Sequence, residues 1–264
     1  MTRTLTLRTV AYAPGARQPT HRHDQVHFSM LLSGSVCETV GSRCEIGSAL
    51  CVSSKDAGLM HANQWGASGA RVARLAVECA SLAELVDHPT PGAPWRWIRQ
   101  APVTRAFARL ITRAAHEGAH FAADDADVVD LLALFTAHSG GSSTGTPPVW
   151  LEDALRYMRE CFAPSLRVAD VAARAGVHPV YLARCVRRWY GTGVSDELRR
   201  LRCAAAVTAI VEGEATFSTV AHACGYADEP HLHRSINHHV GVPPKQLRRA
   251  LKALPFRLTR GPGN

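Results

Sequence analysis

Two copies of one pattern in the last hundred or so residues constrain this chain more than any other feature. Each copy predicts a short helix, a turn that contains glycine, and a second helix that carries arginine. Gly176 and Gly225 stand where the leading helices end, and there the backbone needs a positive φ that glycine adopts without a Cβ clash. The predicted helix pairs are 168–175 with 179–190 and 217–224 with 229–240.

The second helix of each copy has a core stripe and an arginine at matching positions. Apolar residues four apart lie on one side of a helix, so they predict the side that packs inward. An arginine two residues after the first of them lies off that stripe. Pro179 suits the first position of one helix, and Asp228 can accept from free N–H groups at the start of the other. The core pairs are Leu182 with Val186 and Leu232 with Ile236, and the arginines are Arg184 and Arg234.

These two copies resemble the repeating signature of the AraC/XylS family of transcription regulators. The resemblance extends over about 149–249, and the second copy is similar to the more diagnostic half of the signature. The motifs are Ala169-x-x-Ala172 and Ala175-Gly176-Val177-x-Pro179-x-Tyr181-Leu182-x-Arg184 in the first copy, and Val220-Ala221-x-x-Cys224-Gly225-Tyr226-x-Asp228-x-x-x-Leu232-x-Arg234 with Gly241-Val242-Pro243-Pro244-x-x-x-Arg248 in the second.

The resemblance implies an all-α domain of seven helices in which 198–211 joins the two units. Such a helix spans on the order of 20 Å, which lets both units read one face of double-stranded DNA. Arginine can bond guanine in a bidentate pair, glutamate can accept from cytosine, and small apolar side chains can touch a thymine methyl. The implied base contacts are Val180, Ala183 and Arg184 in the first unit, and Glu229, Pro230, His233 and Arg234 in the second. Arg187, Arg188, Arg248 and Arg249 are expected at phosphates.

Three departures from the family pattern concern the second helices. His178 replaces the usual serine cap, Ile236 replaces a usual phenylalanine, and Asn-His-His at 237–239 replaces a basic stretch. We therefore expect the first unit to supply most of the affinity, and the histidines of the second to be surface residues or to make binding depend on pH.

The first half of the chain predicts a different architecture. Short apolar runs between Gly, Ser and Asp turns over residues 1–80 favour a small β-sandwich or barrel. Helical spacing over 103–138 predicts two amphipathic helices, which either close the core of this domain or form the seam of a homodimer. The expected strands include 28–32, 36–40, 49–52 and 72–77.

The clearest boundary is a Gly- and Ser-rich stretch that ends in two prolines. The fold class is thus α+β, with a sensor and dimerisation domain over 1–138, a linker over 139–148, a DNA-binding domain over 149–250 and a tail over 251–264.

Four histidines of the first half have a recognisable spacing. Gly15-x5-His21-x-His23-x3-His27-x6-Gly34 resembles the first motif of the cupins, and Gly58-Leu59-Met60-His61 resembles the second, although Asp56 replaces a usual proline. The resemblance implies a cupin-like sensor in which these imidazoles lie together. Neutral imidazoles bind divalent Zn, Fe, Ni or Cu. A metal-free pocket for a small-molecule effector, or histidines that bond backbone carbonyls, are the alternatives.

The charge of the chain is concentrated in its second half. Residues 1–149 hold 13 Lys and Arg against 12 Asp and Glu, whereas residues 150–264 hold 17 against 10. A basic domain attracts polyanions such as DNA, although a solvated basic face gives the same count. The start of the chain lacks the apolar core of a signal peptide and no run is long enough to span a membrane, so we expect a cytoplasmic protein.

The eight cysteines contain no Cys-x-x-Cys pair, and in the cytoplasm we expect them to be reduced and mostly buried. Cys37, Cys44 and Cys51 recur every seven residues, and along one strand an odd spacing alternates between faces, which argues against a joint metal or redox site.

Three classes of function fit these features unequally. A DNA-binding regulator uses both halves, with RNA polymerase as a further candidate partner. A cupin-type metalloprotein or metalloenzyme with an accessory DNA-binding domain uses only the four histidines. No catalytic triad order, phosphate loop or interpretable pair of carboxylates occurs, so we expect no enzyme. An RNA-binding protein is disfavoured because the second half lacks an aromatic stacking platform.

Overall fold

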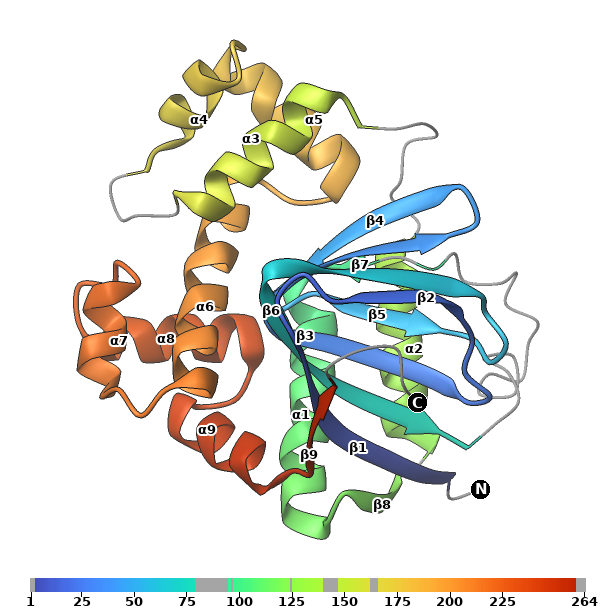
Figure 1. The fold of residues 1–264 in the computed structure, drawn as a ribbon. Helices are drawn as coiled ribbons and strands as arrows, with labels where there is room; N and C mark the ends of the chain where they lie inside the picture. Colours follow the sequence, from blue (N-terminus) through green and yellow to red (C-terminus); the bar gives the residue numbers. More distant parts are fainter. Residues whose placement is uncertain are drawn as a thin grey trace.

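A computed structural model describes residues 3–78, 95, 97–123, 125–139, 147–161 and 166–259 of the chain. It is an α+β structure with an N-terminal sheet and a C-terminal helical region, as the sequence predicts (Figure 1). The strands are β1 (Arg3–Tyr12), β2 (Arg17–His21), β3 (Val26–Val40), β4 (Arg43–Ser48), β5 (Val52–Lys55), β6 (His61–Val77), β7 (Trp97–Ile98), β8 (His120–Ala123) and β9 (Phe256–Thr259). The helices are α1 (Ala101–Glu117), α2 (Asp125–Ser139), α3 (Val149–Glu160), α4 (Val168–Arg174), α5 (Pro179–Tyr190), α6 (Val194–Glu212), α7 (Phe217–Ala223), α8 (Glu229–Val240) and α9 (Pro244–Ala253).

Two long bent strands organise the sheet, whose order is β7-β5-β3-β6-β1-β8. β3 and β6 pair antiparallel along most of their length, with register shifts between Leu31 and Ser33 and between Gly34 and Val36. Such irregularities bend the strands that contain them. Beyond the bend β3 also pairs with β4, and the start of β6 also pairs with β2.

Several predicted strand boundaries are wrong. Segments 28–32 and 36–40 belong to the single strand β3, because the irregularities bend the strand without ending it. Residues 49–51 form a turn, with Leu50 at φ 66°, and β5 begins only at Val52. Strands β7, β8 and β9 lie outside the range 1–80, because they complete the sheet from segments distant in sequence.

One face of the sheet is covered by helices. Val26, Phe28 and Met30 alternate along β3 with residues of the opposite face, and all three are buried in the core that α1 and α2 complete. The buried stripe of α1 lies entirely in this core. The helical pair therefore closes the core of its own chain, which is the first of the two arrangements that the sequence leaves open.

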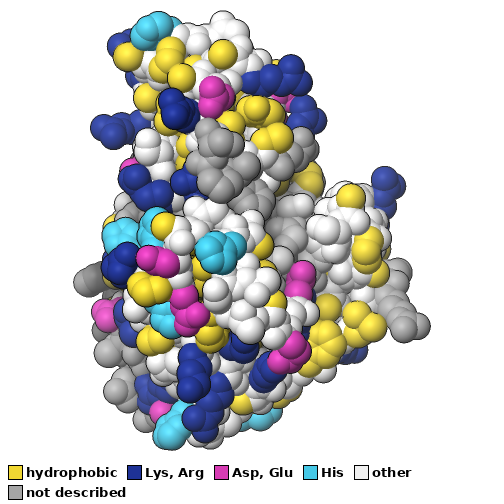
Figure 2. Space-filling model, turned by 90° about the vertical axis from the view of Figure 1, so that its left-hand side faces the viewer, with side chains coloured by type: hydrophobic (Ala, Val, Ile, Leu, Met, Phe, Trp, Pro, Cys, Tyr) yellow, Lys and Arg dark blue, Asp and Glu magenta, His cyan; other side chains and the backbone are white. Residues whose placement is uncertain are grey.

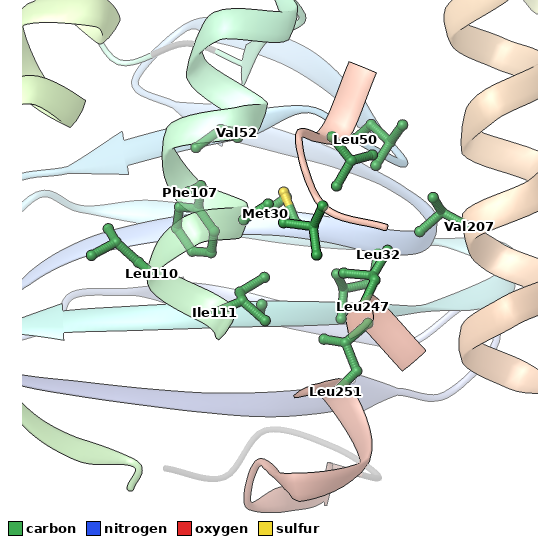
Figure 3. Close-up of a cluster of buried hydrophobic side chains, with 14 of the residues drawn as sticks. Met30, Leu32, Leu50, Val52, Phe107, Leu110, Ile111, Val207, Leu247 and Leu251 are labelled. Carbon is green, nitrogen blue, oxygen red and sulfur yellow. The ribbon is translucent and has the colours of Figure 1, made fainter. Parts of the chain in front are cut away.

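The C-terminal helices are divided between two hydrophobic cores. α3, α4, α5 and the first part of α6 share one core, which ends at Leu201. From Cys203 onward, α6 joins α7, α8 and α9 in the core that also contains the sheet and α1. Figure 3 shows this shared core, with labelled side chains that include Met30 and Leu32 of β3, Phe107 and Ile111 of α1, Val207 of α6, and Leu247 and Leu251 of α9. The division falls within α6, whereas residues 140–146 of the predicted linker lie outside the described residues.

The segment after α9 returns to the N-terminal sheet. β9 pairs parallel with β1, and the Thr9 N–H donates to the carbonyl of Pro255 at 2.8 Å. Residues 256–259 of the predicted tail thus form an edge strand, and residues 260–264 lie outside the described part of the chain.

The expectation that all cysteines are reduced is wrong for one pair. Cys37 of β3 and Cys44 of β4 form a disulfide, with their Cα atoms 6.5 Å apart. Their separation of seven residues spans a hairpin rather than one strand, so the two side chains meet across strands instead of alternating between faces. Cys51 is a free, buried thiol, as expected.

Among the described residues, no helix is both long enough and apolar enough to cross a membrane.

Candidate DNA-binding helices and histidine cluster

The turns and caps of both helix-turn-helix units agree with the sequence. Gly176 and Gly225 have φ values of 67° and 79°, which confirms the predicted positive φ. Pro179 occupies the first turn of α5, and the Asp228 side chain accepts from the His231 N–H at 2.6 Å at the start of α8. At the start of α5, His178 takes the place of the usual cap, and its Nδ1 accepts from the Val180 N–H at 3.3 Å.

The first unit presents a basic face on α5. Leu182 and Val186 are fully buried, which confirms the predicted core stripe. Val180 is 59% exposed and Ala183 is half-buried. The remaining candidate contacts, Arg184, Arg187 and Arg188, are exposed. Apolar and basic side chains therefore lie together on the outer surface of this helix.

The second unit has the same buried stripe and a mixed outer face. Leu232 and Ile236 are fully buried, while Pro230 and Arg234 are exposed. Glu229 and His233 are partly exposed, and Glu229 Oε1 lies 3.5 Å from His233 Nε2. Glu229 places a negative charge beside Arg234 and His233, so this face carries less positive charge than that of α5.

Arg248 and Arg249 of α9 have different surroundings. The Arg248 guanidinium lies over the Phe217 ring at 4.3 Å and donates to the carbonyl of Ala215 at 2.8 Å. Arg248 thus links α9 to the start of α7, whereas Arg249 is exposed. Figure 2 shows Lys and Arg side chains spread from the top to the bottom of this side of the molecule, with several histidines among them.

A buried ion pair joins α6 to the N-terminal sheet. Arg200 makes two hydrogen bonds of 2.8 Å to the carboxylate of Glu197. The same guanidinium donates to Ser48 Oγ at 3.3 Å, at the end of β4, and to the carbonyl of Ala49 at 2.7 Å, in the turn that follows. Burial alone would raise the pKa of Glu197, but Arg200, Arg99 and Arg159 lower it to about 2. The carboxylate is therefore ionised at neutral pH.

The two residues that precede α1 contact the end of α5 and the start of α6. Arg99 Nη1 lies 3.4 Å from Glu197 Oε1, and its guanidinium lies 4.7 Å from the centre of the Tyr190 ring. Gln100 donates to the carbonyl of Tyr190 at 3.2 Å. The segment that precedes α1 thus contacts the first unit, while α1 itself packs on α8 and α9.

The structure brings the predicted histidines together. The ligand atoms of His21, His23 and His61 all lie within 4.8 Å of one another. His27 joins them through its ring, 4.6 Å from that of His23. His21 is the last residue of β2 and His23 follows the strand, so the two share a site without sharing a strand.

Hydrogen bonds fix two of these rings with one nitrogen free. His21 Nδ1 lies 2.8 Å from the carbonyl of Pro19, and His61 Nδ1 lies 3.0 Å from that of Leu59. The Nε2 atoms of both residues are buried and have no hydrogen-bond partner among the residues that the structure describes. A backbone carbonyl that accepts from Nδ1 orients a neutral imidazole so that its Nε2 can bind a metal.

The surroundings of His23, His27 and His61 lower the pKa of each imidazole. Burial, followed by the charge of Arg74, lowers the pKa of His23 to about 2 and that of His27 to about 3. Burial, followed by Lys55, lowers the pKa of His61 to about 4. All three rings therefore have lone pairs available at neutral pH.

A carboxylate and an ammonium lie beside the histidines. Glu38 Oε1 is 3.1 Å from Lys55 Nζ and 3.9 Å from His61 Nε2, and the Trp95 indole donates to Glu38 Oε2 at 2.9 Å. Burial lowers the pKa of Lys55, although Glu38 opposes this shift.

Sequence reasoning did not identify Glu38, Lys55, Glu197 or Arg200. Glu197 and Arg200 lie three residues apart among the buried positions Val194, Leu198 and Leu201, and charged residues on an apolar stripe were the available signal. Glu38 and Lys55 lie on separate strands, and only the sheet register brings them together.

Comparison with known proteins identifies the C-terminal region. Residues 171–250 match a family model described as a helix-turn-helix domain. A Streptomyces lividans protein named as an AraC-like transcription regulator is 34% identical over 96 residues, which are 36% of this chain and 32% of that protein. The chain thus aligns with about a third of that relative's length.

Two solved structures extend the comparison. The C-terminal domain of AraT, a response regulator from Geobacillus stearothermophilus, is 24% identical and covers 40% of this chain and 88% of its own, with a TM-score of 0.38. ToxT from Vibrio cholerae strain SCE256, solved with an unsaturated fatty acid, is 10% identical and covers 96% of this chain and 97% of its own, with a TM-score of 0.40. On the evidence of the family match, this chain carries a helix-turn-helix domain over residues 171–250, and part of the chain is similar to an AraC-like transcription regulator.

Proposed function

We propose that the protein is a sequence-specific DNA-binding transcription regulator that a small ligand in the N-terminal domain controls. The observation that carries this proposal is the pairing of α5 and α8, two helices with equivalent buried stripes whose outer faces present Arg184 and Arg234. A guanidinium on an exposed helix can form a bidentate pair with guanine in the major groove. α6 (Val194–Glu212), which lies between the two units in the chain, is itself about 28 Å long at 1.5 Å per residue, close to the length of one turn of duplex.

The roles of the other exposed residues follow from their chemistry. Val180 and Ala183 suit thymine methyl groups, and Glu229, Pro230 and His233 complete the outer face of α8. Arg187, Arg188 and Arg249 suit phosphates. Arg248, a partly exposed residue, remains a candidate phosphate contact in addition to its bond to Ala215.

DNA affinity tests this function directly. Fragments selected by the purified full-length protein from random duplexes define its site. Arg184→Ala and Arg234→Ala should each weaken binding to that site by about 1–3 kcal/mol and relax the preference at one base. Arg43→Ala, which removes an exposed arginine of β4, is the matched control and should bind like the wild type. Equal loss on every sequence would assign the two arginines to phosphates, and no selectable DNA would exclude the function.

For the N-terminal half, we propose a cupin-like sensor over 1–138, joined to a DNA-binding domain over 149–250. A divalent transition metal fits the sensor, because buried, unpaired Nε2 atoms of His21 and His61 face His23. These three residues would hold the metal with His27 beside it, and the metal would act as a Lewis acid toward a bound ligand. The alternative, a cupin-type metalloprotein or metalloenzyme with an accessory DNA-binding domain, uses the same histidines but predicts no effect of the site on DNA affinity.

Metal content and DNA affinity together distinguish a ligand-controlled regulator from a metalloprotein with an accessory DNA-binding domain. After incubation with Zn²⁺, Ni²⁺ or Fe²⁺ and dialysis, elemental analysis of the full-length protein should show about one metal per chain, and His23→Ala with His61→Ala should abolish it. His116→Ala, on the helix α1, is the control and should keep the metal. Sub-stoichiometric metal in the wild type would exclude the metal site. A regulator should also change its DNA affinity between the metal-loaded and chelated forms.

The shared core would transmit a structural change from the sensor to the DNA-binding helices. Because β3, α1 and α8 pack in one core, a change in the sheet alters the support of the second unit directly. The first unit is reached through α6 and the contacts of Arg99 and Arg200. Ligand occupancy would then change the relative orientation of the two helix-turn-helix units. RNA polymerase and a second copy of the chain remain predicted partners.

A further inference from the structure

A row of polar side chains crosses the sheet next to the histidines. Arg8 of β1 is the direct cross-strand partner of Arg74 of β6. Ser29 of β3 is opposite Arg74 on its other side, and Ser53 of β5 is opposite Ser29. Residues directly opposite each other in an antiparallel sheet project from the same face. Four strands thus place these side chains side by side.

The row lies on the face that looks away from α1. Leu7, Leu75 and Phe28 are the sequence neighbours of the row on three of its strands, and all are fully buried in the core beneath α1. Side chains alternate along a strand, so the row projects from the opposite face. Two residues further along, His27 and Lys55 are themselves cross-strand partners on that face. The row therefore borders the histidine cluster.

The two arginines face each other without a carboxylate between them. Like charges directly opposite in a sheet destabilise it. Burial lowers the pKa of Arg8, and the charges of Arg74 and Arg257 lower it further. In the part of the chain that the structure describes, neither Arg8 nor Arg74 forms an ion pair with an acidic residue, and the nearby Glu38 is engaged by Lys55.

Buried polar atoms around the row also lack partners. Arg74 donates through Nη2 to the Tyr12 hydroxyl at 3.0 Å, but its Nε is buried with no acceptor. Ser29 Oγ, on a side chain that is 2% exposed, and His27 Nδ1 are unpaired as well. A buried donor without an acceptor destabilises the folded protein, so these groups call for a bound acceptor, and the two facing arginines favour one that carries negative charge.

We propose that Arg8 and Arg74 bind the carboxylate of a small organic acid, with Ser29 as a further donor. The inference rests on the proposed ligand-controlled regulator and names the class of its effector. The planar fork of arginine matches a carboxylate in a bidentate arrangement. On the side of the row away from the histidines, Val10, Val72 and Leu31 are paired across the strands and buried. The acid therefore has an apolar body that lies toward these residues.

Thermal unfolding of the full-length protein tests the class of ligand. Sodium hexanoate should raise Tm by several degrees above an equal concentration of sodium chloride, whereas 1-hexanol and sodium phosphate should not. Arg8→Gln and Arg74→Gln should each remove the hexanoate shift. Arg234→Gln, an exposed arginine of α8, should keep it. No specific shift with hexanoate, an equal shift with phosphate, or a shift that survives both sensor substitutions would overturn the proposal.

A second measurement needs no ligand. Because Arg8→Gln removes the repulsion between two facing arginines, it should raise Tm of the ligand-free protein by about 1–3 °C. A lower Tm would show that Arg8 stabilises the ligand-free fold, and this result would contradict the proposed binding site. DNA affinity of the same variant, measured without hexanoate, distinguishes a failure of the proposed ligand class from a failure of the proposed regulator function. Unchanged DNA binding with no hexanoate effect refutes the ligand class alone, whereas absent DNA binding in the wild type refutes the regulator itself.

Discussion

His239 shows how far a side chain can depart from its sequence expectation. The sequence places it with His238 on the surface of α8, yet it is 9% exposed at the junction with α6. Burial, then His238, Arg200 and Arg199, lowers its pKa to about 4. The neighbouring His238 is exposed, so adjacent residues of one type have opposite surroundings because the shared core covers one side of the helix.

This burial predicts a pH dependence of stability. The folded pKa of His239 lies below its unfolded value of about 6.5, so the unfolded chain binds more protons between these values. The contribution of neutral His239 to the free energy of unfolding is complete above pH 6.5 and is lost as the pH falls toward 4. Urea unfolding at pH 7 and pH 5 should show a difference that His239→Gln reduces by about 1–2 kcal/mol. His222→Gln, at an exposed position of α7, should leave the difference unchanged, and an equal effect of both would contradict the assignment.

At the scale of the element, α8 depends on the cap at its start. Asp228 satisfies the N–H of His231 before the helix can supply its own acceptor. The bond also fixes the position of Glu229 and Pro230, the first residues of the proposed DNA-reading face. Local capping thus contributes to stability and to the geometry of the second unit.

We expect Asp228→Ala to lower the free energy of unfolding by about 1 kcal/mol, because the substitution removes this acceptor. Asp228→Asn keeps an oxygen at the same position and should cost only a small fraction of that value. Urea denaturation of the three proteins measures both. A similar loss in both variants would mean that the charge of Asp228, rather than its hydrogen bond, stabilises the helix.

At the scale of the whole molecule, the two hydrophobic cores do not follow the proposed division into sensor and DNA-binding domain. The first unit has its own core, whereas the second shares its core with the sheet and α1. α6 belongs to both cores and carries the Arg200 bond to the sheet between them. The two units should therefore respond differently to a loss of packing in the sensor.

Equivalent substitutions in the two units test this division. Leu182 and Leu232 occupy matching positions of α5 and α8, and both are fully buried. Each change to alanine should cost about 2–5 kcal/mol. In hydrogen exchange followed by mass spectrometry, Leu182→Ala should accelerate exchange in α3 to α5 while sparing β3 and α1. Leu232→Ala should accelerate it in α8, α1 and β3. Faster exchange in β3 after Leu182→Ala would show one cooperative core instead of two.

The local features of this protein were predictable from its sequence. The bounds of α5 and α8, the positive φ at Gly176 and Gly225, the cap at Asp228 and the buried stripes depend on residues within a few positions of each other, and such short-range preferences are legible in a single chain. The gathering of His21, His23 and His61 was also predicted, although through resemblance to a family motif rather than through the periodicity of the strands.

Tertiary structure alone decided which distant residues meet. The facing of Arg8 and Arg74, the pairing of Glu38 with Lys55, the meeting of Cys37 with Cys44 and the seating of Arg200 against Ala49 depend on sheet register and on packing between elements. A shift of one residue in register would send each strand side chain to the opposite face, and local sequence preferences do not specify that register. For the same reason the shared core, which joins the second helix-turn-helix unit to the sheet, follows from the fold as a whole and not from the order of segments in the chain.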